Sequence, residues 1–135
     1  MRGAIHHLNL TVKDPCASLA FYQAVLGFMG YRLVALSKGW CDFERSSGEG
    51  STFVGLVAAK GWNRRRAHDR YSRGLHHLAF RAASREDVDA LFALLVGLGA
   101  TILDPPADYP DYGAGYYAVF FADADGLKLE YVFTP

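Results

Sequence analysis

The sequence contains little cysteine, no net charge and no long hydrophobic run, and each absence excludes a class of protein. Cys16 and Cys41 are its two cysteines and form no Cys-x-x-Cys spacing, so we expect no disulfide framework and no thiolate metal site. Fourteen Lys and Arg residues balance fourteen Asp and Glu residues, which argues against nucleic acid as a partner. No apolar run approaches the roughly 20 residues that span a bilayer, and no secretory signal pattern is present. We therefore expect no membrane partner and a cytoplasmic location.

The composition is that of a folded protein. Of the 135 residues, 51% are hydrophobic and 14% aromatic, which excludes a disordered or fibrous chain. A chain of this length buries enough surface to form a core without covalent cross-links. It fits one compact domain, which can be assembled from two similar halves.

One sequence pattern occurs twice, with an offset of 70 positions. The corresponding positions are residues 5–10 and 75–80, Asp14 and Ser84, and Gly27 and Gly97. The first pair shares a His-His-Leu step, the second pair suits a helix N-cap, and the third pair suits a helix end. We infer an internal duplication within a single domain.

Alternating apolar residues and turn residues predict one strand, one helix and three further strands in each copy. In the first copy we expect strands at 4–12, 31–36, 40–45 and 51–58, with a helix between Asp14 and Gly27. In the second copy we expect strands at 75–82, 100–103, 116–122 and 126–133, with a helix between Ser84 and Gly97. Residues 59–74 form a linker and 104–115 a loop rich in Pro, Tyr and Gly. We predict an α+β fold of two βαβββ modules, about 1–58 and 75–135, that form a curved, open mixed sheet with the helices outside.

Two histidines and one carboxylate share the face of the sheet that faces away from the helices. Alternation places His7 and His77 on this concave face and directs His6 and His76 to the other face. In the last strand Glu130 points to the face opposite that of the leucines. Two imidazoles and a carboxylate are the ligands of a facial triad, which leaves coordination positions open for substrate or water. We predict His7, His77 and Glu130 as ligands of a divalent ion: Fe, Mn, Ni, Co or Zn. The alternative is ordinary hydrogen bonds for the histidines and an edge ion pair for Glu130.

Other residues are candidates for contact with the substrate. Asn9 and Thr11 share the face of His7, and Trp40 is placed to line an apolar pocket. Alternation sends one of the two neighbours Tyr116 and Tyr117 to the concave face, where a hydroxyl can donate to an oxyanion. The candidates are then Glu130 and Tyr117 for catalysis, and Asn9, Thr11, Trp40 and Tyr117 for substrate binding. The alternatives are hydrogen bonds to solvent for the polar residues and core packing for the aromatic ones.

These features resemble the vicinal oxygen chelate superfamily, which groups glyoxalase I, bleomycin-resistance proteins, extradiol dioxygenases and fosfomycin-modifying enzymes. The resemblance is carried by residues 7–14, 18–28, 74–80 and 121–130. It places the metal ligands at His7, His77 and Glu130, in agreement with the alternation. It also implies a small-molecule substrate with oxygen ligands and a homodimer, with the site formed within one chain or across two.

The chain departs from several subfamilies of this group. Glyoxalase I takes a fourth ligand from the last strand of the first copy, and residues 51–60 offer none. Extradiol dioxygenases carry an acid/base tyrosine where this chain has Phe120, and fosfomycin thiol transferases carry an arginine that residues 131–135 do not supply. We expect a metal-dependent enzyme with lyase, isomerase or dioxygenase chemistry. The alternative is a metal-free protein of the bleomycin-resistance type that sequesters a ligand or antibiotic.

Overall fold

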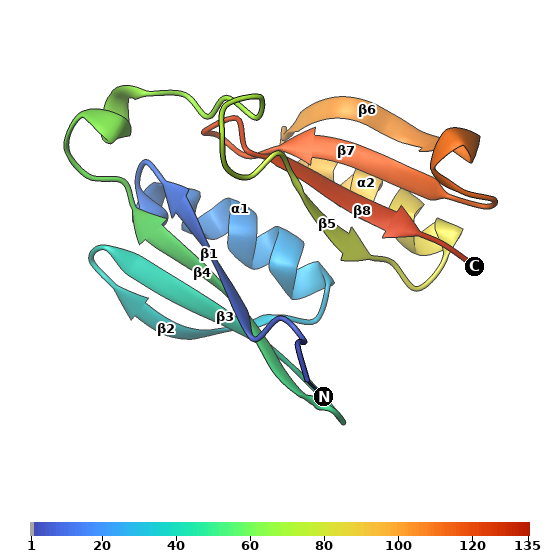
Figure 1. Ribbon diagram of the computed structural model, residues 1–135, viewed down its shortest axis with the longest axis horizontal. Helices are drawn as coiled ribbons and strands as arrows, with labels where there is room; N and C mark the ends of the chain where they lie inside the picture. The colour runs from blue at the N-terminus through green and yellow to red at the C-terminus, as the bar shows by residue number, and fades with distance from the viewer. Residues whose placement is uncertain (1) are drawn as a thin grey trace. The chain divides into compact units, whose positions relative to one another are not determined.

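The chain folds into two compact units, seen in a computed structural model that describes residues 2–135 (Figure 1). One unit ends at Arg66 and the other spans Ala67–Pro135. Each unit contains one strand, one helix and three further strands, which confirms the predicted pair of βαβββ modules. The boundary between the units falls inside the predicted linker.

The first unit is a four-stranded mixed sheet with one helix packed on it. Its elements are β1 (His7–Val12), α1 (Pro15–Phe28), β2 (Arg32–Ser37), β3 (Trp40–Ser47), β4 (Gly50–Ala58) and the short 3-10 helix η1 (Gly61–Arg65). The strand order is β1-β4-β3-β2; β1 runs parallel to β4 and the other pairs are antiparallel. Helix α1 contacts β2, β3 and β4, so one face of the sheet is covered and the other is open.

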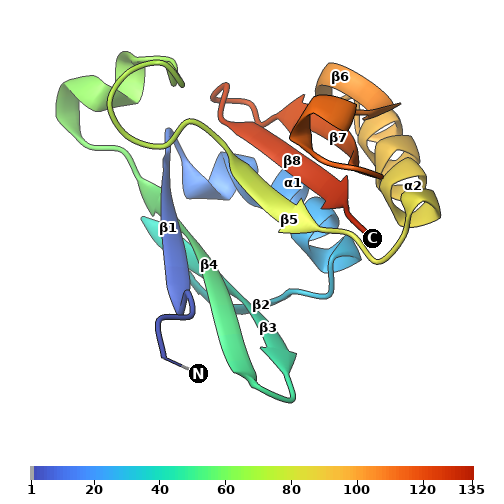
Figure 2. The same ribbon diagram turned by 45° about the vertical axis from the view of Figure 1, so that its right-hand side comes forward.

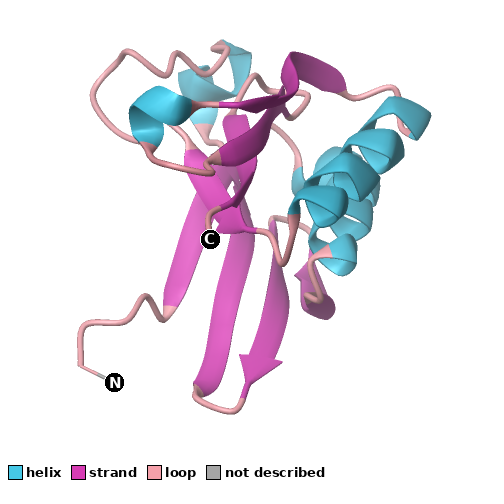
Figure 3. Cartoon of the chain, turned by 90° about the vertical axis from the view of Figure 1, so that its right-hand side faces the viewer, coloured by secondary structure: helices cyan, strands magenta, loops and turns pink. Residues whose placement is uncertain are grey.

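The second unit repeats this topology (Figure 2). Its elements are β5 (Leu78–Arg81), α2 (Arg85–Gly97), β6 (Thr101–Asp108), the 3-10 helix η2 (Pro110–Tyr112), β7 (Tyr117–Ala122) and β8 (Lys128–Phe133). The order is β5-β8-β7-β6, with β5 parallel to β8, and α2 contacts β6, β7 and β8. Figure 3 distinguishes the helices from the strands by colour. Over the described residues, no helix combines the length and apolar composition that a membrane span requires.

The hydrophobic core of each unit lies between its helix and the covered face of its sheet. In the first unit the buried side chains include Leu10, Val12, Tyr22, Val25, Leu26, Cys41, Phe43, Val54 and Leu56. In the second they include Val88, Leu91, Leu95, Val119, Phe121 and Leu129. Because neighbouring strand residues point to opposite faces, burial of these side chains directs their neighbours to the open face.

Both helices begin at the predicted N-caps. The Oδ1 of Asp14 accepts hydrogen bonds from the backbone N–H groups of Cys16 at 2.9 Å and Ala17 at 3.4 Å. The Oγ of Ser84 accepts from the backbone N–H of Asp87 at 3.2 Å. Each cap thus satisfies donors that lack a partner within the first turn of the helix.

Helix α2 ends at the predicted Gly97, and α1 ends one residue after the predicted Gly27. The chain reverses at Gly30, with φ +86°, and at Gly99, with φ +65°. The residue after each of these glycines closes the helix: Tyr31 N–H donates to Leu26 O, and Ala100 N–H to Leu95 O. This hydrogen-bond pattern requires a left-handed residue, which glycine adopts without steric cost.

Strand β6 is longer than predicted, since it continues to Asp108 through part of the expected loop. Its pairing with β7 shifts register between Ile102 and Asp104 and again between Asp104 and Ala107. Pro105 and Pro106 lie within the second shift, where they have no N–H to offer the neighbouring strand. Such a strand is tolerated because β6 is at the edge of the sheet.

We expect Asp14→Ala to lower the free energy of unfolding by about 1 kcal/mol, because two N–H groups of α1 lose their acceptor. Chemical denaturation monitored by circular dichroism measures this loss. Asp14→Asn is the matched control, because asparagine caps a helix about as well and should leave the stability within about 0.5 kcal/mol. Equal destabilisation by the two variants would contradict the cap.

Candidate active site on the open faces of the two sheets

The open face of the second sheet brings His77 and Glu130 together. Glu130 lies on β8, between Ala79 of β5 and Phe120 of β7, and His77 directly precedes β5. The Nε2 of His77 is 3.1 Å from the Oε2 of Glu130. The Glu130 side chain is 2% exposed and that of His77 is 35% exposed, so a nearly inaccessible carboxylate meets a partly accessible imidazole. A buried carboxylate is tolerated only where its oxygens have partners.

The second oxygen of Glu130 is held by a tyrosine. The hydroxyl of Tyr116 donates a hydrogen bond to Glu130 Oε1. Burial, together with this hydrogen bond and the carboxylate charge, raises the pKa of Tyr116 well above its ordinary value. Tyr116 therefore remains a protonated donor at neutral pH, and both oxygens of Glu130 are engaged.

Aromatic rings surround this polar group. The ring of Tyr109 meets Phe120 edge-on at 5.2 Å between centroids and stacks on Tyr112 at 5.8 Å, and Tyr112 contacts Tyr116 at 5.4 Å. The ammonium group of Lys128 lies 4.1 Å from the centre of the Phe120 ring. Burial and neighbouring negative charge raise the pKa of Tyr109. A cluster of aromatic rings thus lies beside the buried carboxylate.

Each candidate histidine ligand touches the histidine that precedes it. The Nδ1 atoms of His76 and His77 are 2.7 Å apart, and those of His6 and His7 are 3.1 Å apart. The prediction that His6 and His76 point away is wrong, because both precede the strands, where strict alternation does not apply. Partial desolvation and the charges of His77, Lys128 and Arg70 lower the pKa of His76. In each neutral pair one ring donates and the other accepts, so the contact can fix which nitrogen of the candidate ligand remains free.

The open face of the first sheet holds a groove of about 440 Å³. Its lining residues are His6, His7, Asn9, Trp40, Asp42, Phe53 and Val57. Two of the predicted substrate contacts, Asn9 and Trp40, therefore lie in one groove with the predicted ligand His7. Thr11 lies on the same face, opposite Val57, but does not line the groove.

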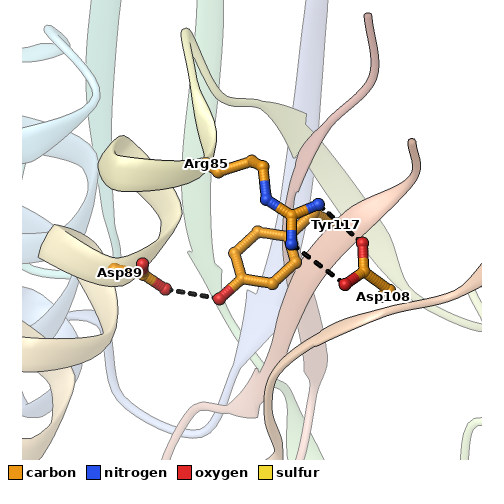
Figure 4. A network of polar contacts seen from close by, with 4 residues as sticks. All are labelled: Arg85, Asp89, Asp108 and Tyr117. Carbon is orange, nitrogen blue, oxygen red and sulfur yellow. Dashed lines mark hydrogen bonds and ion pairs between the residues drawn. The ribbon is translucent and has the colours of Figure 1, made fainter.

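Tyr117 lies on the other face of its sheet, against α2 (Figure 4). Its hydroxyl donates to Asp89 Oδ1 at 2.7 Å, and the guanidinium of Arg85 lies 3.9 Å from the centre of its ring. Arg85 also forms two hydrogen bonds with Asp108, at 2.6 and 2.9 Å. Register explains this placement: Tyr117 pairs with Phe133 of β8, whose parity is that of the covered face. The structure therefore places Tyr116, rather than Tyr117, beside Glu130.

Comparison with known proteins identifies the family of this fold and site. The sequence model of the Glyoxalase/Bleomycin resistance protein/Dioxygenase superfamily matches residues 4–131. The chain belongs to this superfamily. The chain is 30% identical to the uncharacterized Bacillus subtilis (strain 168) protein YqjT over 128 residues, which cover 95% of this chain and 97% of the relative.

Solved structures of the glyoxalase superfamily have the same fold. A Bacillus halodurans protein with the provisional name of glyoxalase is 32% identical, with a TM-score of 0.83, and the match covers 98% of this chain and 97% of that one. The Listeria monocytogenes fosfomycin resistance protein FosX has a TM-score of 0.72 over 100% of this chain and 96% of its own. At 21% identity, the second likeness shows the fold alone.

Metals are common in the glyoxalase superfamily, and the donor atoms of the second unit suit a divalent ion. Metal bonds of about 2.1 Å at right angles place neighbouring donor atoms about 3 Å apart. The 3.1 Å between His77 Nε2 and Glu130 Oε2 matches this spacing. Within the part of the chain that the structure describes, no group of three His, Cys, Asp or Glu side chains is placed to hold an ion, and the third predicted ligand, His7, belongs to the first unit.

We expect Tyr116→Phe to lower the free energy of unfolding at neutral pH by about 1.5–3 kcal/mol, because buried Glu130 loses a hydrogen bond. The raised pKa means that the folded state holds the tyrosine proton more tightly than the unfolded state. This stabilisation is therefore complete below the unfolded pKa of about 10 and declines as the pH rises towards the folded value.

Urea unfolding of both proteins at neutral pH and at about pH 11 measures the loss and its decline. Tyr71→Phe serves as the control, since Tyr71 is exposed and does not touch the Tyr116–Glu130 bond. A stability difference that grows with pH would contradict the assigned direction of the pKa shift.

Proposed function

We propose that the protein is a divalent-metal-dependent enzyme that acts on a small molecule bound through oxygen atoms, with His7, His77 and Glu130 as the metal ligands. The observation that carries this proposal is the contact between buried Glu130 and His77, at the spacing of two neighbouring ligands. The repeat supports His7 as the third ligand, because the His6–His7 and His76–His77 ring contacts occupy equivalent places in the two units. Membership of the superfamily supports the same set.

The surrounding residues position the ligands. Tyr116 fixes one oxygen of Glu130, so that the other oxygen is directed towards His77. The lowered pKa of His76 favours its neutral form, which can accept a hydrogen bond from the Nδ1–H of His77. In that arrangement the Nε2 lone pair of His77 is free to bind the ion. Once bound, the ion supplies a positive charge that stabilises negative charge developing on a substrate oxygen.

For the reaction we propose lyase or isomerase chemistry ahead of dioxygenase chemistry. Phe120 pairs with Glu130 at the position where a dioxygenase-like acid/base tyrosine is expected, and its ring has no proton to transfer. The nearest hydroxyl, that of Tyr116, is already donated to Glu130. As a separate expectation carried by the family resemblance, we propose that the protein acts as a homodimer.

A second candidate function is supported by the groove of the first unit. Trp40, Phe53 and Val57 give it an apolar lining that accepts a ligand without any metal. On this proposal the protein sequesters a ligand or antibiotic in the manner of bleomycin-resistance proteins.

We expect the purified protein to bind one divalent ion per chain, and His7→Ala, His77→Ala and Glu130→Gln each to weaken this binding at least about tenfold. Elemental analysis and competition with a chelator measure content and affinity. His68→Gln and Asp89→Asn are matched controls, because His68 contacts the Leu75 carbonyl and Asp89 binds Tyr117 on the covered face. Metal affinity equal to wild type in all three ligand variants would rule out the site.

The two candidate functions differ in their response to EDTA. A panel of hemithioacetals, catechols and epoxides is assayed with the metal-loaded protein, with EDTA, and after metal is restored. The enzyme proposal predicts turnover that EDTA abolishes and metal restores, because the charge on the ion stabilises the reacting oxygen. The sequestering proposal predicts no turnover and a calorimetric signal for bleomycin that persists in EDTA.

A further inference from the structure

Two polar side chains meet over a glycine in the groove of the first unit. Gly55 of β4 pairs with Asn9 of β1 on one side and with Asp42 of β3 on the other. A Cβ at position 55 would lie 2.3 Å from Asn9 Oδ1 and 2.6 Å from Asp42 Oδ1. Both side chains therefore lean over the backbone of β4 into the space that a side chain would fill.

The groove around this pair is apolar and contains no fixed positive charge. Trp40, Phe53 and Val57 supply its apolar surface, and no lysine or arginine is among its lining residues. Asp42 is thus a carboxylate in a largely aromatic groove, with an amide beside it. Such a carboxylate binds most strongly to a donor that itself carries positive charge.

We propose that Asn9 and Asp42 form a recognition subsite for a cationic nitrogen donor, such as an ammonium or amidinium group, on a ligand whose aromatic body packs against Trp40 and Phe53. The inference rests on the proposed function, since His7 lines the same groove. It adds a property of the substrate: besides the oxygen atoms that bind the metal, the substrate carries a nitrogen donor at a separate position. Asn9 and Asp42 contact the ligand directly and are not metal ligands.

Gly55 provides a substitution that disturbs the pair without removing either polar group. The added methyl group of Gly55→Ala falls within 3 Å of both side-chain oxygens, which lie at the ends of flexible side chains and can be displaced. Gly27→Ala is the matched control, because a Cβ at that position of α1 meets no atom within 4 Å. Circular dichroism and thermal unfolding verify that each variant is folded.

The experiment uses the fluorescence of Trp40 in the full chain with Trp62→Phe, which removes the only other tryptophan. Benzamidine and benzoate are titrated as aromatic probes of similar size and opposite charge, in the presence of EDTA so that benzoate cannot bind through a metal ion. We expect benzamidine to bind at least about 10-fold more tightly than benzoate, and Asp42→Asn and Gly55→Ala to remove this preference while Gly27→Ala retains it.

Two results would overturn the subsite: equal or absent binding of the two probes to the wild-type groove, or an unchanged preference in both Asp42→Asn and Gly55→Ala. Metal affinity is measured on the same variants. The subsite is supported if Asp42→Asn keeps the wild-type metal affinity and loses the preference for benzamidine. If Asp42→Asn loses metal affinity, Asp42 is a metal ligand and the proposed subsite is overturned. The His77→Ala variant separates the two proposals. If it loses metal affinity and still prefers benzamidine, the subsite exists independently of the metal site, so the failure of one proposal can be told from the failure of the other.

Discussion

Burial of the Glu130 carboxylate is the constraint on which the candidate site depends. A carboxylate that is 2% exposed is costly unless each oxygen has a partner, and the energy of one unpaired charge exceeds that of most single packing contacts. Tyr116 and His77 provide these partners. Because β8 pairs with β5 on one side and β7 on the other, Glu130 is held by backbone hydrogen bonds of both neighbours. The fold thus fixes the acid, while the more exposed His77 supplies the accessible side of the site.

The two units share one topology, but their open faces carry different residues. Each unit carries two contacting histidines at the start of the first strand of a parallel pair, and each leaves one face of its sheet open. In the second unit that face carries a buried acid and a wall of aromatic rings. In the first unit the absence of a side chain at Gly55 leaves a groove in which Asn9 and Asp42 approach each other. The two open faces therefore differ in chemical character.

Much of this arrangement could be predicted from the sequence, because alternation and the 70-residue offset determine which strand residues share a face. The structure places Tyr117 on the covered face, because Tyr116 and not Tyr117 has the parity of Phe120, the residue that pairs with Glu130. The sequence alone does not give that pairing. The contacts of His6 and His76 could not be predicted, since they lie outside the strands. Nor could the meeting of Asn9 with Asp42, because it depends on the register of three strands, which periodicity alone does not determine.

The neighbours Tyr116 and Tyr117 form hydrogen bonds on opposite faces of the second sheet. One hydroxyl is donated to Glu130 on the open face, and the other to Asp89 of α2 on the covered face. The second tyrosine is also covered by Arg85, which is itself held by Asp108 of β6. The start of β7 is therefore anchored to the helix and to the edge strand directly after Tyr116, which donates to the buried acid. Because the strength of a hydrogen bond depends on its geometry, anchoring on the covered face helps to hold Tyr116 in position beside Glu130 on the open face.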